Sequence, residues 1–135
     1  MANLQKSSKI IHITLWVAQV TLAALFITGA VMKFQPIETI SAMMPWTGQV
    51  PAWIVRLLGL IDLLAAVGLI LPSLLRIKPQ LTTWTALGII ALMFSAIIFH
   101  VSRGEASVIG VNIISAIIAL FIAWGRLKKA PITAQ

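Results

Sequence analysis

At 135 residues, the chain has the length of a single domain. Its composition is 60% hydrophobic and only 10% charged, which is far from the average for a soluble protein. It contains no cysteine, which excludes disulfides, thiol redox chemistry, cysteine-ligated zinc and iron–sulfur clusters. The net charge of +7 does not indicate nucleic-acid binding, because no basic stripe with interleaved aromatic residues accompanies it.

Four long apolar stretches predict an all-α protein, a bundle of four transmembrane helices. They cover about residues 10–31, 53–71, 81–101 and 106–124. Each holds roughly 18–22 residues, which at 1.5 Å rise per residue matches the hydrocarbon core of a bilayer. No period-2 alternation is present, so helices are favoured over the strands of a membrane barrel. We therefore expect one membrane domain over residues 1–135, surrounded by the lipid bilayer.

The basic residues predict the orientation of these four helices. One side carries seven of them, namely Lys6, Lys9, Arg76, Lys78, Arg126, Lys128 and Lys129. The opposite side carries three, namely Lys33, Arg56 and Arg103. Because cytoplasmic loops hold the excess of Lys and Arg, we expect both termini in the cytoplasm and the chain in the inner (plasma) membrane.

Asp62 is the only acid expected inside one of the apolar stretches. A charge at the bilayer centre costs roughly 2.5–3.5 kcal/mol on insertion scales, so it needs a partner, a proton or water. Gly59, Asp62 and Ala66 lie on one face of small residues, which predicts that Asp62 faces the interior of the bundle. Other polar residues share its outer half of the bundle. The predicted polar pocket comprises Lys33, Arg56, Asp62, His100, Arg103 and Asn112.

Three interpretations of this polar set are open at the level of sequence. A carboxylate paired with His100, Lys33 or Arg56 would hold the helices in register. A pocket that opens outward would bind a proton, a quinone head group or a small anion, with Asp62 and His100 affecting each other's protonation. A protonated Asp62 would instead donate one hydrogen bond to the backbone.

Enzyme signatures are missing from the sequence. It has no G-x-S-x-G, P-loop or H-E-x-x-H motif, so no catalytic residue is predicted. Its two histidines, His12 and His100, are expected near opposite membrane faces, so haem ligation by both is not expected. Asp62 and His100 are too few for a metal site.

The order and spacing of several short motifs resemble the DoxX-like family of small four-helix membrane proteins, over about residues 16–126. The motifs are Phe26-x-x-Gly29-x-x-x-Lys33-Phe34, Gly59-x-x-Asp62, Gly68-Leu69-Ile70-Leu71-Pro72, Ala96-x-x-x-His100 with Gly104, and Arg126. The family usually has glutamate where this chain has Asp62, whose carboxylate reaches one methylene less far.

The resemblance implies an accessory membrane subunit in quinone-linked or oxidative-stress redox metabolism. Relatives look like subunits of thiosulfate:quinone oxidoreductase, or like partners of enzymes that handle reactive sulfur. A quinone is then the candidate cofactor, and a membrane-bound or peripheral redox enzyme the candidate partner. The resemblance does not identify a reaction.

Two other functions compete with the accessory-subunit hypothesis. One is a small proton-coupled transporter or exporter, which is disfavoured because the first apolar stretch contains no acid. The other is a purely structural assembly factor, in which Asp62 serves packing alone. Stripes of Gly and Ala left on lipid-facing surfaces are compatible with a homo-oligomer in each case.

Overall fold

The computed structural model describes residues 2–135, with side chains from Ser8 onward. The side chain of Lys6, which was counted for the orientation, lies outside the described residues. In chain order the elements are α1 (Ala2–Lys33), α2 (Ile37–Ile40), the 3₁₀ turn η1 (Pro45–Gly48), α3 (Ala52–Leu75), α4 (Gln80–Ser102), the 3₁₀ turn η2 (Ala106–Val108), α5 (Gly110–Trp124) and the π-helical turn η3 (Gly125–Lys129).

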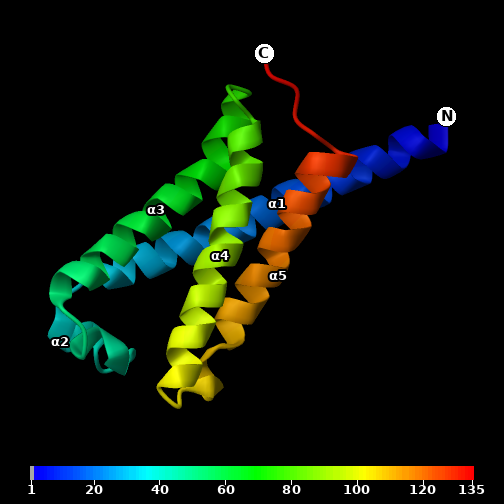
Figure 1. Cartoon of the computed structure of the whole chain (residues 1–135). Coiled ribbons are helices and arrows are strands. Elements are labelled where there is room, and N and C mark those ends of the chain that lie inside the picture. Colours follow the sequence, from blue (N-terminus) through cyan, green and yellow to red (C-terminus); the bar gives the residue numbers. More distant parts are fainter. Residues whose placement is uncertain (1) are drawn as a thin grey trace.

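Four of these helices are long and apolar enough to cross a membrane, which confirms the predicted all-α, four-span fold. The candidate spans are Ser8–Lys33, Ala52–Leu75, Gln80–Ser102 and Gly110–Lys129. Both termini and the α3–α4 connection lie at one end of the bundle, here called the terminal end (Figure 1). The α1–α3 and α4–α5 connections lie at the other end, here called the loop end.

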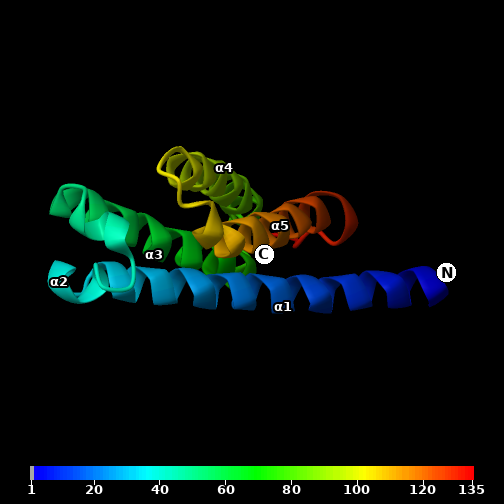
Figure 2. The ribbon, with the colours of Figure 1, turned by 90° about the horizontal axis from the view of Figure 1, so that it is seen from below.

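The helices pack as two pairs that separate toward the loop end. α1 packs along α3, and α4 packs along α5. Seen from below, α3 and α5 lie next to α1, and α4 lies on their far side (Figure 2). At the loop end the α1–α3 pair and the α4–α5 pair diverge, and the turns α2 and η1 lie beside the end of α3 (Figure 1).

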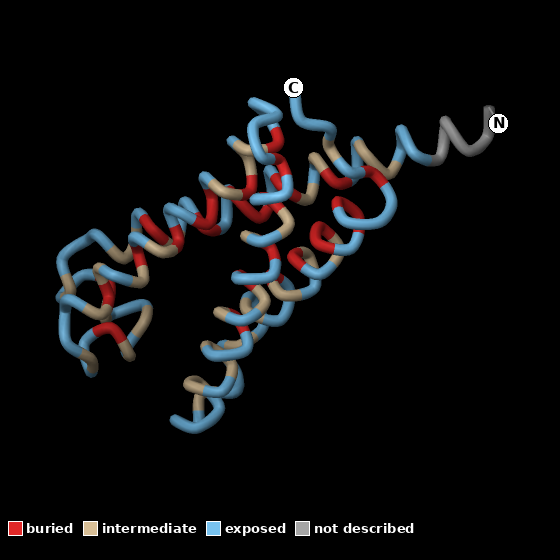
Figure 3. Tube along the Cα trace, turned by 45° about the horizontal axis from the view of Figure 1, so that its top comes forward, coloured by how far each residue is buried: buried red, intermediate tan, exposed pale blue. Residues whose placement is uncertain are grey.

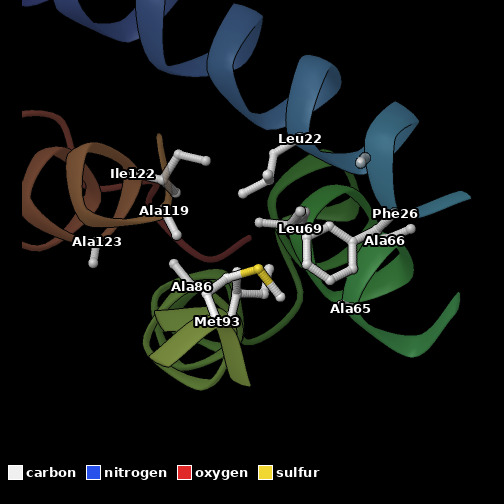
Figure 4. Close-up of a cluster of buried hydrophobic side chains, with 12 residues drawn as sticks. Leu22, Phe26, Ala65, Ala66, Leu69, Ala86, Met93, Ala119, Ile122 and Ala123 are labelled. Atoms are coloured by element: carbon white, nitrogen blue, oxygen red, sulfur yellow. The ribbon is translucent and has the colours of Figure 1, made fainter. Parts of the chain in front are cut away.

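Small residues let the helices approach closely at the centre of the bundle. Ala65 and Ala66 of α3, Ala86 of α4 and Ala119 of α5 are buried there. Larger side chains, including Leu22, fill the space between them (Figure 4). Buried residues face the centre of the bundle, whereas exposed ones follow the outer helix faces (Figure 3). This is the pattern of helices that associate within lipid through packing of small residues.

α3 continues through Pro72, although the second span was predicted to end near residue 71. Proline has no N–H to donate to the carbonyl four residues earlier, which here belongs to Gly68. Thr82 Oγ1 of α4 donates to that carbonyl oxygen at 3.2 Å and so replaces the missing bond. In lipid every backbone polar group needs such a partner, and the repair lets α3 extend to Leu75.

The other helix ends also differ from the predicted ones. α1 extends to Lys33 rather than to residue 31, and α5 begins at Gly110 rather than at residue 106. Residues 106–108 form the turn η2 instead. Gly104, with φ of 74°, reverses the chain direction after α4. η2 therefore occupies residues that were assigned to the fourth span.

Two helical glycines provide a matched test of the α3–α4 contact. A Cβ atom at Gly68 would lie 2.2 Å from Thr85 Oγ1 and 3.1 Å from Thr85 Cβ, whereas one at Gly88 would meet nothing within 4 Å. We expect Gly68→Ala to lower the free energy of unfolding by about 1–3 kcal/mol, because rotating Thr85 does not remove the Cβ contact. Gly88→Ala should raise it by up to about 1 kcal/mol through helix propensity. Unfolding in mixed detergent micelles measures both, and equal effects would contradict the close contact.

Candidate functional site at the loop end

A buried ion pair joins α1 to α3 near the loop end. Lys33 Nζ lies 2.6 Å from Asp62 Oδ2, and the two side chains are 16% and 9% exposed. A Cβ atom at Gly29 would lie 3.0 Å from Asp62 Oδ2, and one at Gly59 would lie 3.0 Å from Lys33 Cβ. The two glycines therefore leave the space that the ion pair occupies. The sequence offered His100, Lys33 and Arg56 as partners of Asp62, and in the structure the partner is Lys33.

Arg56 lies beside this ion pair and binds the end of α1. Its Nη1 atom donates to the carbonyl oxygens of Lys33 and Gln35, both at 2.6 Å. The last carbonyls of a helix have no partner within the helix and carry the negative end of its dipole. Arg56 therefore stabilises the C-terminus of α1 instead of pairing with Asp62.

His100, Arg103 and Glu105 form a second polar group at the end of α4. Glu105 Oε1 lies 3.2 Å from His100 Nδ1 and accepts a hydrogen bond from Arg103 Nε at 2.9 Å. The turn at Gly104 brings the carboxylate back over the helix end, where the Glu105 N–H donates to the His100 carbonyl at 2.8 Å. These hydrogen bonds, first from His100 and then from Arg103, lower the pKa of Glu105 from its ordinary value.

Aromatic rings surround this group. The Phe99 and Trp46 ring centroids lie 5.3 Å and 6.4 Å from that of His100, in edge-to-face geometry. Arg103 stacks over Phe99 at 5.2 Å and also donates to the Gln49 side chain. The residues Trp46, Phe99, His100, Arg103 and Glu105 are called the His100 cluster below.

The predicted polar residues thus lie in separate groups. Lys33, Arg56 and Asp62 come together on the α1–α3 pair, and His100 and Arg103 come together at the end of α4. Within the described part of the chain, Asp62 and His100 form no ion pair. The Asn112 side chain is partly buried and has no hydrogen bond to another described residue. The separation follows from the divergence of the two helix pairs.

A larger polar network at the terminal end was not predicted as a site. Gln19 is fully buried; its Nε2 atom donates to the Leu69 carbonyl at 2.6 Å and its Oε1 atom accepts from Arg126 Nε at 2.7 Å. Arg126 also contacts His12, and Ser73 and Thr82 share a hydrogen bond of 2.7 Å. From the sequence, Arg126 was predicted to be a charge flanking the fourth span. The available signal was Gln19, a polar residue in the middle of an apolar stretch.

Among the residues that the structure describes, no three His, Asp or Glu side chains are grouped closely enough to hold a metal ion. The functional chemistry offered by these residues is hydrogen bonding, proton transfer and charge.

Four apolar helices packed around a core of small residues define a multi-pass membrane protein in contact with the lipid bilayer. The chain belongs to the DoxX-like family, whose sequence model matches residues 17–122. None of the curated proteins or solved structures compared with the chain matches it.

Proposed function

We propose that the protein is an accessory membrane subunit whose His100 cluster binds the head group of a quinone used by a partner redox enzyme. The supporting observation is the position of His100 between a carboxylate and two aromatic rings at one end of the bundle. A quinone head group is a flat ring with two carbonyl oxygens, so it needs an aromatic surface and a hydrogen-bonding group.

The hydrogen bond to Glu105 sets the chemistry available to His100. A carboxylate only accepts, so His100 Nδ1 carries the proton and Nε2 is left to face a ligand. Among the described residues, Nε2 has no hydrogen-bond partner. A neutral His100 would accept a hydrogen bond from a quinol hydroxyl, and a protonated one would donate to a quinone carbonyl.

In this proposal the loop end faces outward and both termini are cytoplasmic. The support is the excess of Lys and Arg at the terminal end, where Lys9, Arg76, Lys78, Lys128 and Lys129 lie. The pairing of Asp62 with Lys33 weighs against the transporter hypothesis, since a carrier acid must exchange its proton with water and the Asp62 carboxylate is buried against a cation. The same pair favours a structural role for Asp62 itself.

Quenching of tryptophan fluorescence tests the quinone proposal, because Trp46 lies within the cluster. We expect a short-chain ubiquinone to quench the protein saturably in nanodiscs, and Trp46→Phe to remove the saturable component. His100→Ala should weaken the apparent affinity about tenfold, the value of one good hydrogen bond. Ser102→Ala, an exposed substitution in the same helical turn, is the matched control and should leave it unchanged. Unsaturable quenching, or equal curves for His100→Ala and Ser102→Ala, would contradict the proposal.

A further inference from the structure

The terminal end of the bundle contains a buried cation, Arg126, that has no charged partner among the described residues. Arg126 is 5% exposed. Besides its bond to Gln19, its Nη1 atom lies 2.8 Å from His12 Nδ1 and donates to the Ala130 carbonyl at 2.9 Å. Its Nη2 atom is buried and has no hydrogen-bond partner in the described part of the chain. A buried charge left without a countercharge is strongly unfavourable.

No carboxylate side chain of the chain can supply that countercharge. The sequence has three acids, Glu38, Asp62 and Glu105. Asp62 is paired with Lys33, and Glu105 is paired with Arg103, both toward the loop end. Glu38 lies in α2, also at the loop end. None of these acidic side chains pairs with Arg126, and an anion from another molecule would supply the missing countercharge.

A cavity of about 330 Å³ lies next to Arg126. It is lined by His12 and Trp16 of α1, by Ser73 and Arg76, and by residues 131–133. Two of these residues touch the guanidinium, since Nη1 bonds to His12 and the group stacks over the Trp16 ring at 5.6 Å. The cavity is large enough for a phosphate or carboxylate group together with several waters.

The cavity lining offers hydrogen-bond donors. Because Arg126 Nη1 can only donate, His12 Nδ1 is the acceptor, and the proton of the neutral ring lies on Nε2. Arg76 uses Nε to bind the Thr133 carbonyl at 2.7 Å, and its two terminal nitrogens have no partner among the described residues. An oxyanion in the cavity would accept hydrogen bonds from these donors, and its negative charge would offset the charge of the neighbouring Arg126.

We propose that this cavity is a binding site for a phosphate or carboxylate oxyanion. The inference is independent of the quinone proposal, which concerns the opposite end of the bundle. Two sources supply this chemistry, the head group of an anionic phospholipid and a small soluble anion. The lining also includes the apolar residues Trp16, Pro131 and Ile132, which can contact an anion from either source.

The test uses the full-length protein in nanodiscs of phosphatidylcholine, with the midpoint of thermal unfolding as the readout. In one arm inorganic phosphate is titrated at constant ionic strength, and in the other phosphatidylglycerol replaces part of the lipid. We expect saturable stabilisation in at least one arm. Arg76→Gln should raise the anion concentration for half-maximal stabilisation by about tenfold or more, as expected for the loss of a charge-assisted hydrogen bond.

Lys78→Gln is the matched control. Lys78 lies in the same connection as Arg76, is exposed like Arg76 and has a similar left-handed backbone, but it does not line the cavity. It should leave the half-maximal concentration unchanged. Stabilisation by phosphatidylglycerol alone supports a lipid head group, and stabilisation by phosphate supports a soluble anion. No saturable effect in either arm, or equal effects of Arg76→Gln and Lys78→Gln, would overturn the proposal.

Discussion

Lys33→Met is expected to lower the free energy of unfolding by about 3–5 kcal/mol, because it leaves the buried Asp62 carboxylate without its cation. The 2.6 Å contact is closely packed against Gly29 and Gly59. Titration with a denaturing detergent, followed by tryptophan fluorescence, measures the loss. We expect Asp62→Leu to cost less, since a lysine at the end of α1 can extend its ammonium group toward the interface.

The double variant Lys33→Met/Asp62→Leu distinguishes the effect of the charges of this ion pair from the effect of its side-chain packing. Two apolar side chains of similar volume remove both charges together, and such replacements of buried ion pairs are often close to neutral. We therefore expect the double variant to recover most of the stability that Lys33→Met loses. Additive losses in this double-mutant cycle would mean that the two side chains act separately. Quinone binding should be unaffected in the double variant if the His100 cluster is the quinone site.

Gln19→Leu is expected to lower the free energy of unfolding by about 2–5 kcal/mol. The substitution removes the acceptor of Arg126 Nε, so a buried guanidinium group loses a partner, and it also removes the Gln19 donor to the Leu69 carbonyl. Each orphaned group costs about 1–3 kcal/mol, and more when it is charged.

The control for this prediction is Gln80→Leu, the same change at an exposed position at the start of α4. Surface changes of this kind lie within about 0.5 kcal/mol. Detergent-induced unfolding of both variants gives the comparison. If Gln19→Leu were as stable as Gln80→Leu, the hydrogen bonds of the terminal-end network would add nothing to stability.

The four helices were predictable from hydrophobic length, but their ends were not. Length and hydropathy locate a span because the bilayer requires about 20 apolar residues. The end of α3 depends on a hydroxyl from another helix, since Thr82 replaces the bond that Pro72 cannot make. The start of α5 depends on the turn at Gly104. Tertiary contacts and turn geometry of this kind have no signature within a single apolar stretch.

The site was predictable in part. A lone acid in an apolar stretch indicated a buried partner, and the structure shows that this partner is Lys33. The sequence could not show that α1–α3 and α4–α5 diverge, which places His100 with Glu105 instead of with Asp62. Arg126 was predicted to be a flanking charge because it follows the end of the predicted fourth span. Its burial depends on Gln19 and His12, which lie more than a hundred positions earlier.

The proline in α3 has a consequence for how the protein is made. α3 is synthesised before α4, and until α4 packs beside it the Gly68 carbonyl lacks the Thr82 hydroxyl that later binds it. Gln19 of α1 is already present and can bind the neighbouring Leu69 carbonyl. The C-terminal turns of α3 therefore reach their final hydrogen bonding only when α4 packs beside them. Insertion of α4 is thus the step that completes the hydrogen bonding of α3, and we expect these two helices to enter the membrane as a hairpin.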